Sequence, residues 1–141
     1  MFTPLDTHVF VAPQIDADGI RQAAMQGIVS VINNRPDGEQ STQPESGALE
    51  RLATSLGLAY HYIPVTHAGF SALQIEQLIV ALGQAEGPVL AFCRSGTRST
   101  LLWALARAKL GDSPDAITEK AAVAGYDVSP VRAMMDMLAP R

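Results

Sequence analysis

The fold is decided by residues 88–109, which read PVLAFCRSGTRSTLLWALARAK. The apolar run Val89–Phe92 is short enough for a buried strand. A helical pattern follows, with apolar residues on one face at Leu101, Ala104, Leu105 and Ala108. Residues 93–99, CRSGTRS, lie between these two patterns. The sequence therefore predicts a tight turn from a strand into a helix, and this turn begins with the chain's only cysteine, Cys93.

This turn brings together groups that stabilise a thiolate and bind an anion. A helix N-terminus presents unpaired N–H groups and a partial positive charge. Arg94 and Arg98 add positive charge, and no Asp or Glu occurs between residues 87 and 111. These features favour the thiolate of Cys93, which is the nucleophilic form, and Arg98 can grip two anion oxygens. The other candidate anion-binding residues are Arg94, Ser95, Gly96, Thr97 and Ser99.

The alternative for Cys93 is a purely structural role. A free cysteine is often a small buried hydrophobe. Such a cysteine gains nothing from two adjacent arginines, a glycine and three hydroxyl groups, so we favour a reactive thiol. Reactive thiols lie in electropositive, partly exposed surroundings, and we therefore expect Cys93 to be partly exposed.

The bulk composition is that of a single globular domain over residues 1–141. Its hydrophobic content is 48% and its formal net charge is −4, which disfavours partners such as nucleic acid or an anionic membrane. One cysteine forms no internal disulfide, which fits a reducing compartment, and we expect a cytoplasmic protein. No residues show the spacing of a metal site, and no cofactor is implied.

The rest of the chain alternates between strand and helix patterns. Further strands are expected at residues 8–11, 28–32 and 59–63. Helix starts are expected at Asp16, Ser71, Ser113 and Ser129. This alternation predicts an α/β fold, with a mostly parallel four- to five-stranded sheet and helices on both faces.

Ligands of such sheets bind beyond the carboxyl ends of the strands. The loops that follow residues 32, 63 and 92 all leave from that edge. We therefore expect residues 35–39, RPDGE, to lie near Cys93 together with Thr66 and His67. The polar segment 33–46 is long for a connection in a compact domain, and loops of this length are often functional or mobile.

The chain resembles a known family over residues 8–132. The resemblance rests on VFVAPQ, AAMQGIVSVINNRPDGEQ, LGLAYHYIPV, AFCRSGTRSTLLWAL and AGYDVSPVR. These segments are similar to the phosphatase-like domain of bacterial beta-lactamase-hydrolase-like proteins, a group with the fold of dual-specificity protein tyrosine phosphatases. The resemblance implies that Cys93 attacks phosphorus to form a phosphocysteine. It also implies that Arg98 holds the phosphate, and that Ser99 steadies the leaving thiolate.

The sequence departs from the phosphatase pattern in two places. Four residues separate Cys93 from Arg98, whereas the phosphatase signature has five. The phosphatases also carry an Asp general acid where this chain has Thr66 and His67. General acid catalysis contributes about 10²–10⁴-fold, so another group is needed for efficient turnover. The candidates are His67, Asp37 and Glu39, whose alternative roles are those of ordinary loop and turn residues.

The turn is also similar to the active loop of rhodaneses, in which four residues separate cysteine and arginine. Three hypotheses follow for a small anionic or phosphorylated ligand. The leading one is a cysteine-dependent phosphatase-like hydrolase acting on a phosphate monoester. The second is a sulfurtransferase that forms a persulfide on Cys93, which requires no Asp acid. The third is a catalytically weak anion- or phosphoprotein-binding module.

Overall fold

A five-stranded sheet forms the centre of the computed structural model, which describes residues 2–140. The strand order is β1-β2-β5-β3-β4. Strands β2 (Val9–Ala12), β5 (Val89–Phe92), β3 (Ser30–Asn33) and β4 (Ala59–Tyr62) are parallel, and β1 (Thr3–Pro4) pairs antiparallel with β2. The mostly parallel α/β sheet is thus confirmed. The two-residue strand β1 was not predicted, because it is too short to carry a periodic pattern.

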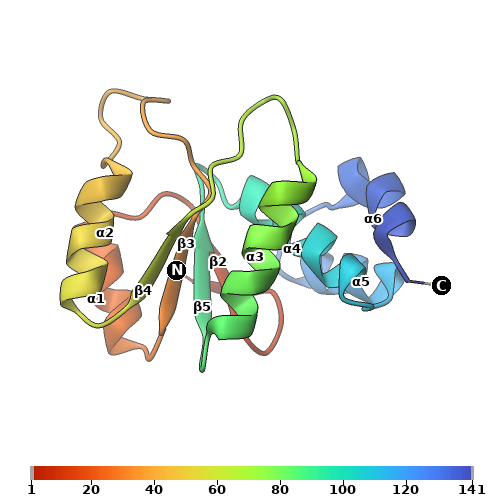
Figure 1. Ribbon diagram of the computed structural model, residues 1–141, viewed down its shortest axis with the longest axis horizontal. Coiled ribbons are helices and arrows are strands. Elements are labelled where there is room, and N and C mark those ends of the chain that lie inside the picture. The colour runs from red at the N-terminus through yellow and green to blue at the C-terminus, as the bar shows by residue number, and fades with distance from the viewer. Residues whose placement is uncertain (1, 141) are drawn as a thin grey trace.

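Helices cover both faces of the sheet (Figure 1). Helices α1 (Ala17–Met25) and α2 (Ser46–Ser55) cover one face, while α3 (Ala72–Gln84) and α4 (Thr97–Lys109) cover the other. Helices α5 (Pro114–Val123) and α6 (Arg132–Leu138) pack against α4 on the side away from the sheet. Within residues 2–140, no helix combines the length and the apolar character that crossing a membrane requires.

Helix α4 is surrounded by other elements rather than buried along one face only. It contacts α3, α5 and α6. Residues outside the predicted apolar face, including Leu102 and Ala106, are therefore fully buried as well. Trp103 is also buried, and its indole Nε1 donates to the Asp6 carboxylate at 2.9 Å. This packing fixes the direction of α4 and hence the position of the loop that precedes it.

Three of the four predicted helix starts are confirmed by side-chain caps. Asp16 accepts a hydrogen bond from the amide of Gly19, and Ser113 caps α5 with Pro114 in the first turn. Ser71 forms a reciprocal capping box with Gln74. The fourth prediction is wrong, because Ser129 lies inside a 3₁₀ turn, Ser129–Val131, and its hydroxyl donates to Asp127. Helix α6 begins only after that turn, at Arg132.

Candidate functional site

The cysteine loop, residues 93–99, leaves the carboxyl end of β5 in the middle of the sheet. β5 is flanked by β2 and β3 and is buried along its whole length. The loop turns at Gly96, the N-cap of α4, which has a left-handed backbone with φ of 90°. The Gly96 amide donates a hydrogen bond to the Cys93 sulfur at 3.1 Å. The predicted junction of strand, cysteine turn and helix is therefore present, with an amide directed at the sulfur.

Gly96 is required here for space as well as for its backbone conformation. A Cβ at this position would collide with the hydroxyl of Tyr126. That hydroxyl lies over the loop and donates to the Ser95 carbonyl at 3.1 Å. Burial and the neighbouring Cys93 charge raise the pKa of Tyr126. Tyr126 is thus part of the surroundings of the sulfur, although no local pattern in the sequence indicated it.

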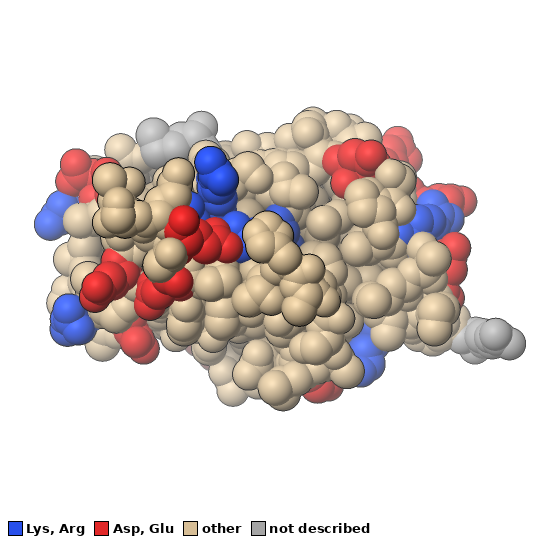
Figure 2. All heavy atoms as spheres, turned by 90° about the horizontal axis from the view of Figure 1, so that it is seen from above, with Lys and Arg blue, Asp and Glu red and all other residues tan. Residues whose placement is uncertain are grey.

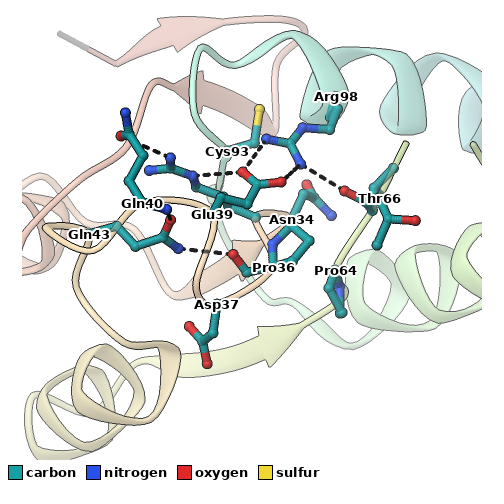
Figure 3. Close-up of polar contacts among 12 residues, drawn as sticks. Asn34, Pro36, Asp37, Glu39, Gln40, Gln43, Pro64, Thr66, Cys93 and Arg98 are labelled. Carbon is teal, nitrogen blue, oxygen red and sulfur yellow. Dashed lines mark hydrogen bonds and ion pairs between the residues drawn. The ribbon is translucent and has the colours of Figure 1, made fainter. Parts of the chain in front are cut away.

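Cys93 is completely buried, with 0% of its surface exposed. The expectation of a partly exposed thiol is therefore wrong for this state of the protein. Figure 3 shows the Arg98 guanidinium and the Glu39 carboxylate beside Cys93. The hydrogen bond to Glu39 is the largest cause of the raised pKa of Arg98, and Cys93 makes a smaller contribution. The buried sulfur thus has both a guanidinium, from Arg98, and a carboxylate, from Glu39, beside it.

Arg98 is held by a carboxylate from the long loop between β3 and α2. Its Nη1 and Nη2 donate to the two oxygens of Glu39 at 2.8 and 2.9 Å (Figure 3). Nη1 also donates to the Val65 carbonyl at 2.8 Å. This fork-to-fork geometry is the arrangement in which arginine binds carboxylates and phosphates. Glu39 therefore binds the two terminal nitrogens of Arg98 that we expected to bind an anionic ligand.

A second arginine, Arg35, also binds this carboxylate. Its side chain is almost fully buried and its Nε donates to Glu39 Oε1 at 2.9 Å. Its two terminal nitrogens donate to the side-chain oxygens of Gln14, at 3.2 Å, and Gln40, at 3.1 Å. A buried charge is tolerated only when it is paired and hydrogen-bonded, and each nitrogen of this guanidinium has an acceptor. The topology argument placed residues 35–39 near Cys93, but Gln14 and Gln40 were missed.

The two arginines strongly perturb the titration of Glu39. The hydrogen bond from Arg98, with a smaller contribution from Arg35, lowers the pKa of Glu39 from 4.5 to about 2. Glu39 in turn raises the pKa of Arg98. Glu39 is therefore ionised at neutral pH in this state, and it cannot donate a proton while it remains on Arg98.

No acidic residue lies between positions 87 and 111, but carboxylates from outside this segment pair with positive charges within it. Glu39 neutralises Arg98, Asp112 pairs with Arg107, and Glu76 pairs with Lys109. Figure 2 looks down on the carboxyl edge of the sheet and shows Lys or Arg atoms directly beside Asp or Glu atoms. Three of these positive charges are thus balanced by carboxylates, of which Glu39 and Glu76 are distant in the sequence and Asp112 is close.

Two of the candidate proton donors, Asp37 and His67, have ordinary turn and loop surroundings. The Asp37 carboxylate accepts from the Ser46 amide at 2.8 Å, at the start of α2, and Figure 3 shows it directed away from Cys93. The Asp37 amide donates a hydrogen bond to the Tyr62 hydroxyl at 2.9 Å. His67 is exposed in the loop between β4 and α3. The alternative roles in turn and loop therefore describe both residues.

The other predicted loop residues divide into an exposed and a buried group. Arg94, Ser95 and Thr97 are exposed, and the Ser95 hydroxyl donates to that of Thr97 at 2.9 Å. Ser99 is buried and donates to the Asn34 side-chain oxygen at 2.8 Å, not to Cys93. Asn34 continues this connection by donating to the Ile63 carbonyl. In this state Ser99 links α4 to the neighbouring loops and does not contact the sulfur.

Comparisons with known proteins agree with this fold. The family model described as "Beta-lactamase hydrolase-like protein, phosphatase-like domain" matches residues 2–110. A beta-lactamase hydrolase-like protein of Xylella fastidiosa is 36% identical over 101 residues, covering 72% of this chain and 23% of that protein. One from Agrobacterium fabrum is 39% identical over 83 residues, covering 59% of this chain and 19% of that protein. The chain thus matches less than a quarter of these relatives' length.

Solved structures extend the likeness beyond the family model. A crystal structure of a candidate phosphatase from Neisseria meningitidis is 36% identical, with a TM-score of 0.83 and 96% of each chain covered. The active form of Tk-PTP shares only the fold, at 14% identity and a TM-score of 0.77, covering 97% of this chain and 95% of that one. The chain belongs to the phosphatase-like domain family of beta-lactamase hydrolase-like proteins, and it has the fold of the protein tyrosine and dual-specificity phosphatases.

Proposed function

We propose that this domain is a cysteine-dependent hydrolase that acts on a phosphate monoester. One observation carries the proposal: the Cys93 sulfur accepts the Gly96 amide at 3.1 Å at the start of α4, with the Arg98 guanidinium beside it. This arrangement stabilises a thiolate and provides donors for a tetrahedral anion. Membership in a phosphatase-like family supports the same choice of substrate.

In the proposed reaction the Cys93 thiolate attacks phosphorus and forms an S–P bond. The P–O bond to the alcohol breaks, and its electron pair leaves with that oxygen, which requires a proton. Water then attacks the phosphocysteine, the S–P bond breaks, and inorganic phosphate leaves. Loop amides and the Arg98 fork hold the non-bridging oxygens, where charge must be stabilised in the transition state.

The test is hydrolysis of para-nitrophenyl phosphate by the purified protein. Cys93→Ser should abolish turnover, and Arg98→Ala should lower kcat/KM by on the order of 10³-fold. Rapid acid quenching followed by mass spectrometry should detect one phosphoryl group on Cys93. Arg107→Ala, which lies at the far end of α4, is the matched control. Absence of turnover across a panel of aryl and alkyl phosphates would contradict the proposal.

Sulfur transfer is the second candidate function. The four-residue spacing between Cys93 and Arg98 favours it, and so does the Asp37 carboxylate, which is directed away from Cys93. In this reaction the thiolate attacks the outer sulfur of thiosulfate, the S–S bond breaks, and sulfite leaves with the electron pair. Cyanide then takes the sulfur from the persulfide as thiocyanate. Intact mass after incubation with thiosulfate should show one added sulfur, and an unmodified protein would remove this candidate.

A further inference from the structure

We infer that Glu39 is the general acid of this site, and that it takes this role by leaving Arg98 when a substrate phosphate binds there. The inference rests on the proposed function and adds the proton donor that the sequence pattern lacks. It depends on the contacts among Glu39, Arg98 and Arg35 and on the position of this cluster beside Cys93 (Figure 3).

The first step is competition for one guanidinium. Both terminal nitrogens of Arg98 donate to Glu39, at 2.8 and 2.9 Å. A phosphate held by the same fork needs these two donors, because bidentate binding uses two parallel N–H groups. Carboxylate and phosphate therefore cannot both bind Arg98 in this way. Substrate binding must displace Glu39 from at least one nitrogen.

The second step concerns where the displaced carboxylate remains. Arg35 donates from Nε to Glu39 Oε1, and its own position is fixed by Gln14 and Gln40. This second contact does not involve Arg98, so it can hold the carboxylate at the edge of the site after the first contact breaks. Glu39 Oε2, which accepts only from Arg98 Nη1 in the resting state, becomes the free oxygen.

The third step is a change in protonation. The charged groups that contact Glu39 are Arg98 from α4 and Arg35 from its own loop, and the titratable Cys93 lies beside them at the end of β5. The Arg98 hydrogen bond is the largest cause of the lowered pKa of Glu39, and substrate binding removes it. A bound phosphate dianion also places negative charge next to the carboxylate, which raises its pKa further. The same event that fills the anion site thus favours protonated Glu39.

Protonated Glu39 then balances the chemistry of both half-reactions. As the S–P bond forms and the P–O bond breaks, the Glu39 proton passes to the leaving oxygen and an alcohol departs. The resulting carboxylate accepts a proton from the water that attacks the phosphocysteine. The S–P bond breaks with its electron pair on sulfur, which restores the thiolate, and phosphate is released. Glu39 thus regains its proton, releases it to solvent once phosphate has left, and returns to Arg98 as a carboxylate.

The experiment compares Glu39→Gln with Glu45→Gln, a control that removes an exposed carboxylate from the same loop. Glutamine keeps an oxygen for Arg35 but carries no charge and donates no acidic proton. Turnover of phenyl phosphate, whose leaving group needs a proton, should fall about 10²-fold or more in Glu39→Gln. Turnover of dinitrophenyl phosphate, whose leaving group needs none, should fall less than about threefold. Calorimetric titration with inorganic phosphate should show about tenfold tighter binding than in Glu45→Gln.

The outcomes separate this inference from the proposed function. If the wild-type protein hydrolyses phosphate esters but Glu39→Gln behaves like Glu45→Gln, only the inference is overturned. Equal losses on both substrates, or unchanged phosphate affinity, also overturn it. A wild-type protein without hydrolysis overturns both. Should Glu39→Gln not fold, Glu39→Asp tests the same point, because its shorter carboxylate reaches Arg98 less well but still supplies a proton. The Glu39→Asp protein should bind phosphate more tightly than the wild type and keep the wild-type preference between substrates. Loss of either property overturns the inference.

Discussion

The two ends of α4 carry similar ion pairs with different origins. At the N-terminal end, Arg98 binds Glu39, which lies 59 residues away in the sequence. At the C-terminal end, Arg107 binds Asp112, only five residues away, through Nε at 2.8 Å and Nη2 at 3.0 Å. Both pairs use two nitrogens of one guanidinium, and both carboxylates have a lowered pKa for that reason.

The helix dipole shows why these two pairs differ in purpose. A cation in the last turn of a helix is stabilising, so Arg107 fits the needs of the fold. A cation in the first turn is destabilising by the same argument, yet Arg98 lies there, beside the Cys93 sulfur. Glu39 neutralises Arg98 in the resting state, and we propose that Arg107 serves the fold whereas Arg98 serves anion binding.

The largest expected effect is a loss of activity that follows substitution of Arg98 but not of Arg107. Arg98→Lys keeps the charge but removes the fork, so kcat/KM for para-nitrophenyl phosphate should fall by about 10²–10³-fold. Arg107→Lys makes the same chemical change at the other end of α4 and should stay within about twofold of the wild type, as distant surface changes usually do. Steady-state kinetics check both variants. Equal losses in the two variants would remove the distinction between the ends.

The second prediction uses the glycines at the two ends of α4. Gly96 and Gly111 both have positive φ, 90° and 107°. Gly111 has nothing within 4 Å of an added Cβ, whereas at Gly96 the Cβ would collide with Tyr126. Gly111→Ala should therefore cost about 1–2 kcal/mol of unfolding free energy from backbone strain alone. Gly96→Ala should cost more in urea unfolding and also lower turnover, because the amide that binds Cys93 shifts. Equal unfolding costs would show that Tyr126 moves aside freely.

The same contrast explains how much the sequence predicted. Val89–Phe92 and the capping box at Ser71 depend on local patterns, and the structure places both as expected. The topology of parallel strands also brings Glu39, from the predicted segment 35–39, beside Cys93, whereas Asp37 of the same segment points away. These features depend on neighbours in the sequence or on a general rule of sheet architecture, so a single chain is sufficient to find them.

The missed features all depend on packing between distant segments. Asp37 and Glu39 lie two residues apart in one polar loop, and the sequence alone does not say which of them faces the site. The structure decides it through the Ser46 amide, which holds Asp37 at the start of α2 and leaves Glu39 for Arg98. Tyr126 above Gly96 has no local signal at all.

The smallest expected effect compares the two carboxylates by acid unfolding. The pKa of folded Glu39, about 2, lies below its ordinary 4.5, so its stabilising contribution is complete above about pH 4.5 and is lost as the pH falls toward 2. Asp112 behaves with the same sign, but its main partner is one guanidinium, with Lys120 contributing at a distance. The thermal midpoint should therefore fall less between about pH 6 and pH 2 in Glu39→Gln than in the wild type. The two falls should differ by about 3–5 °C, since a partly exposed pair contributes roughly 1 kcal/mol or less. Asp112→Asn should flatten the profile less. A larger flattening in Asp112→Asn would show that the pair at the C-terminal end of α4 is the stronger one, and Glu39 would then be held too weakly to keep Arg98 occupied at rest.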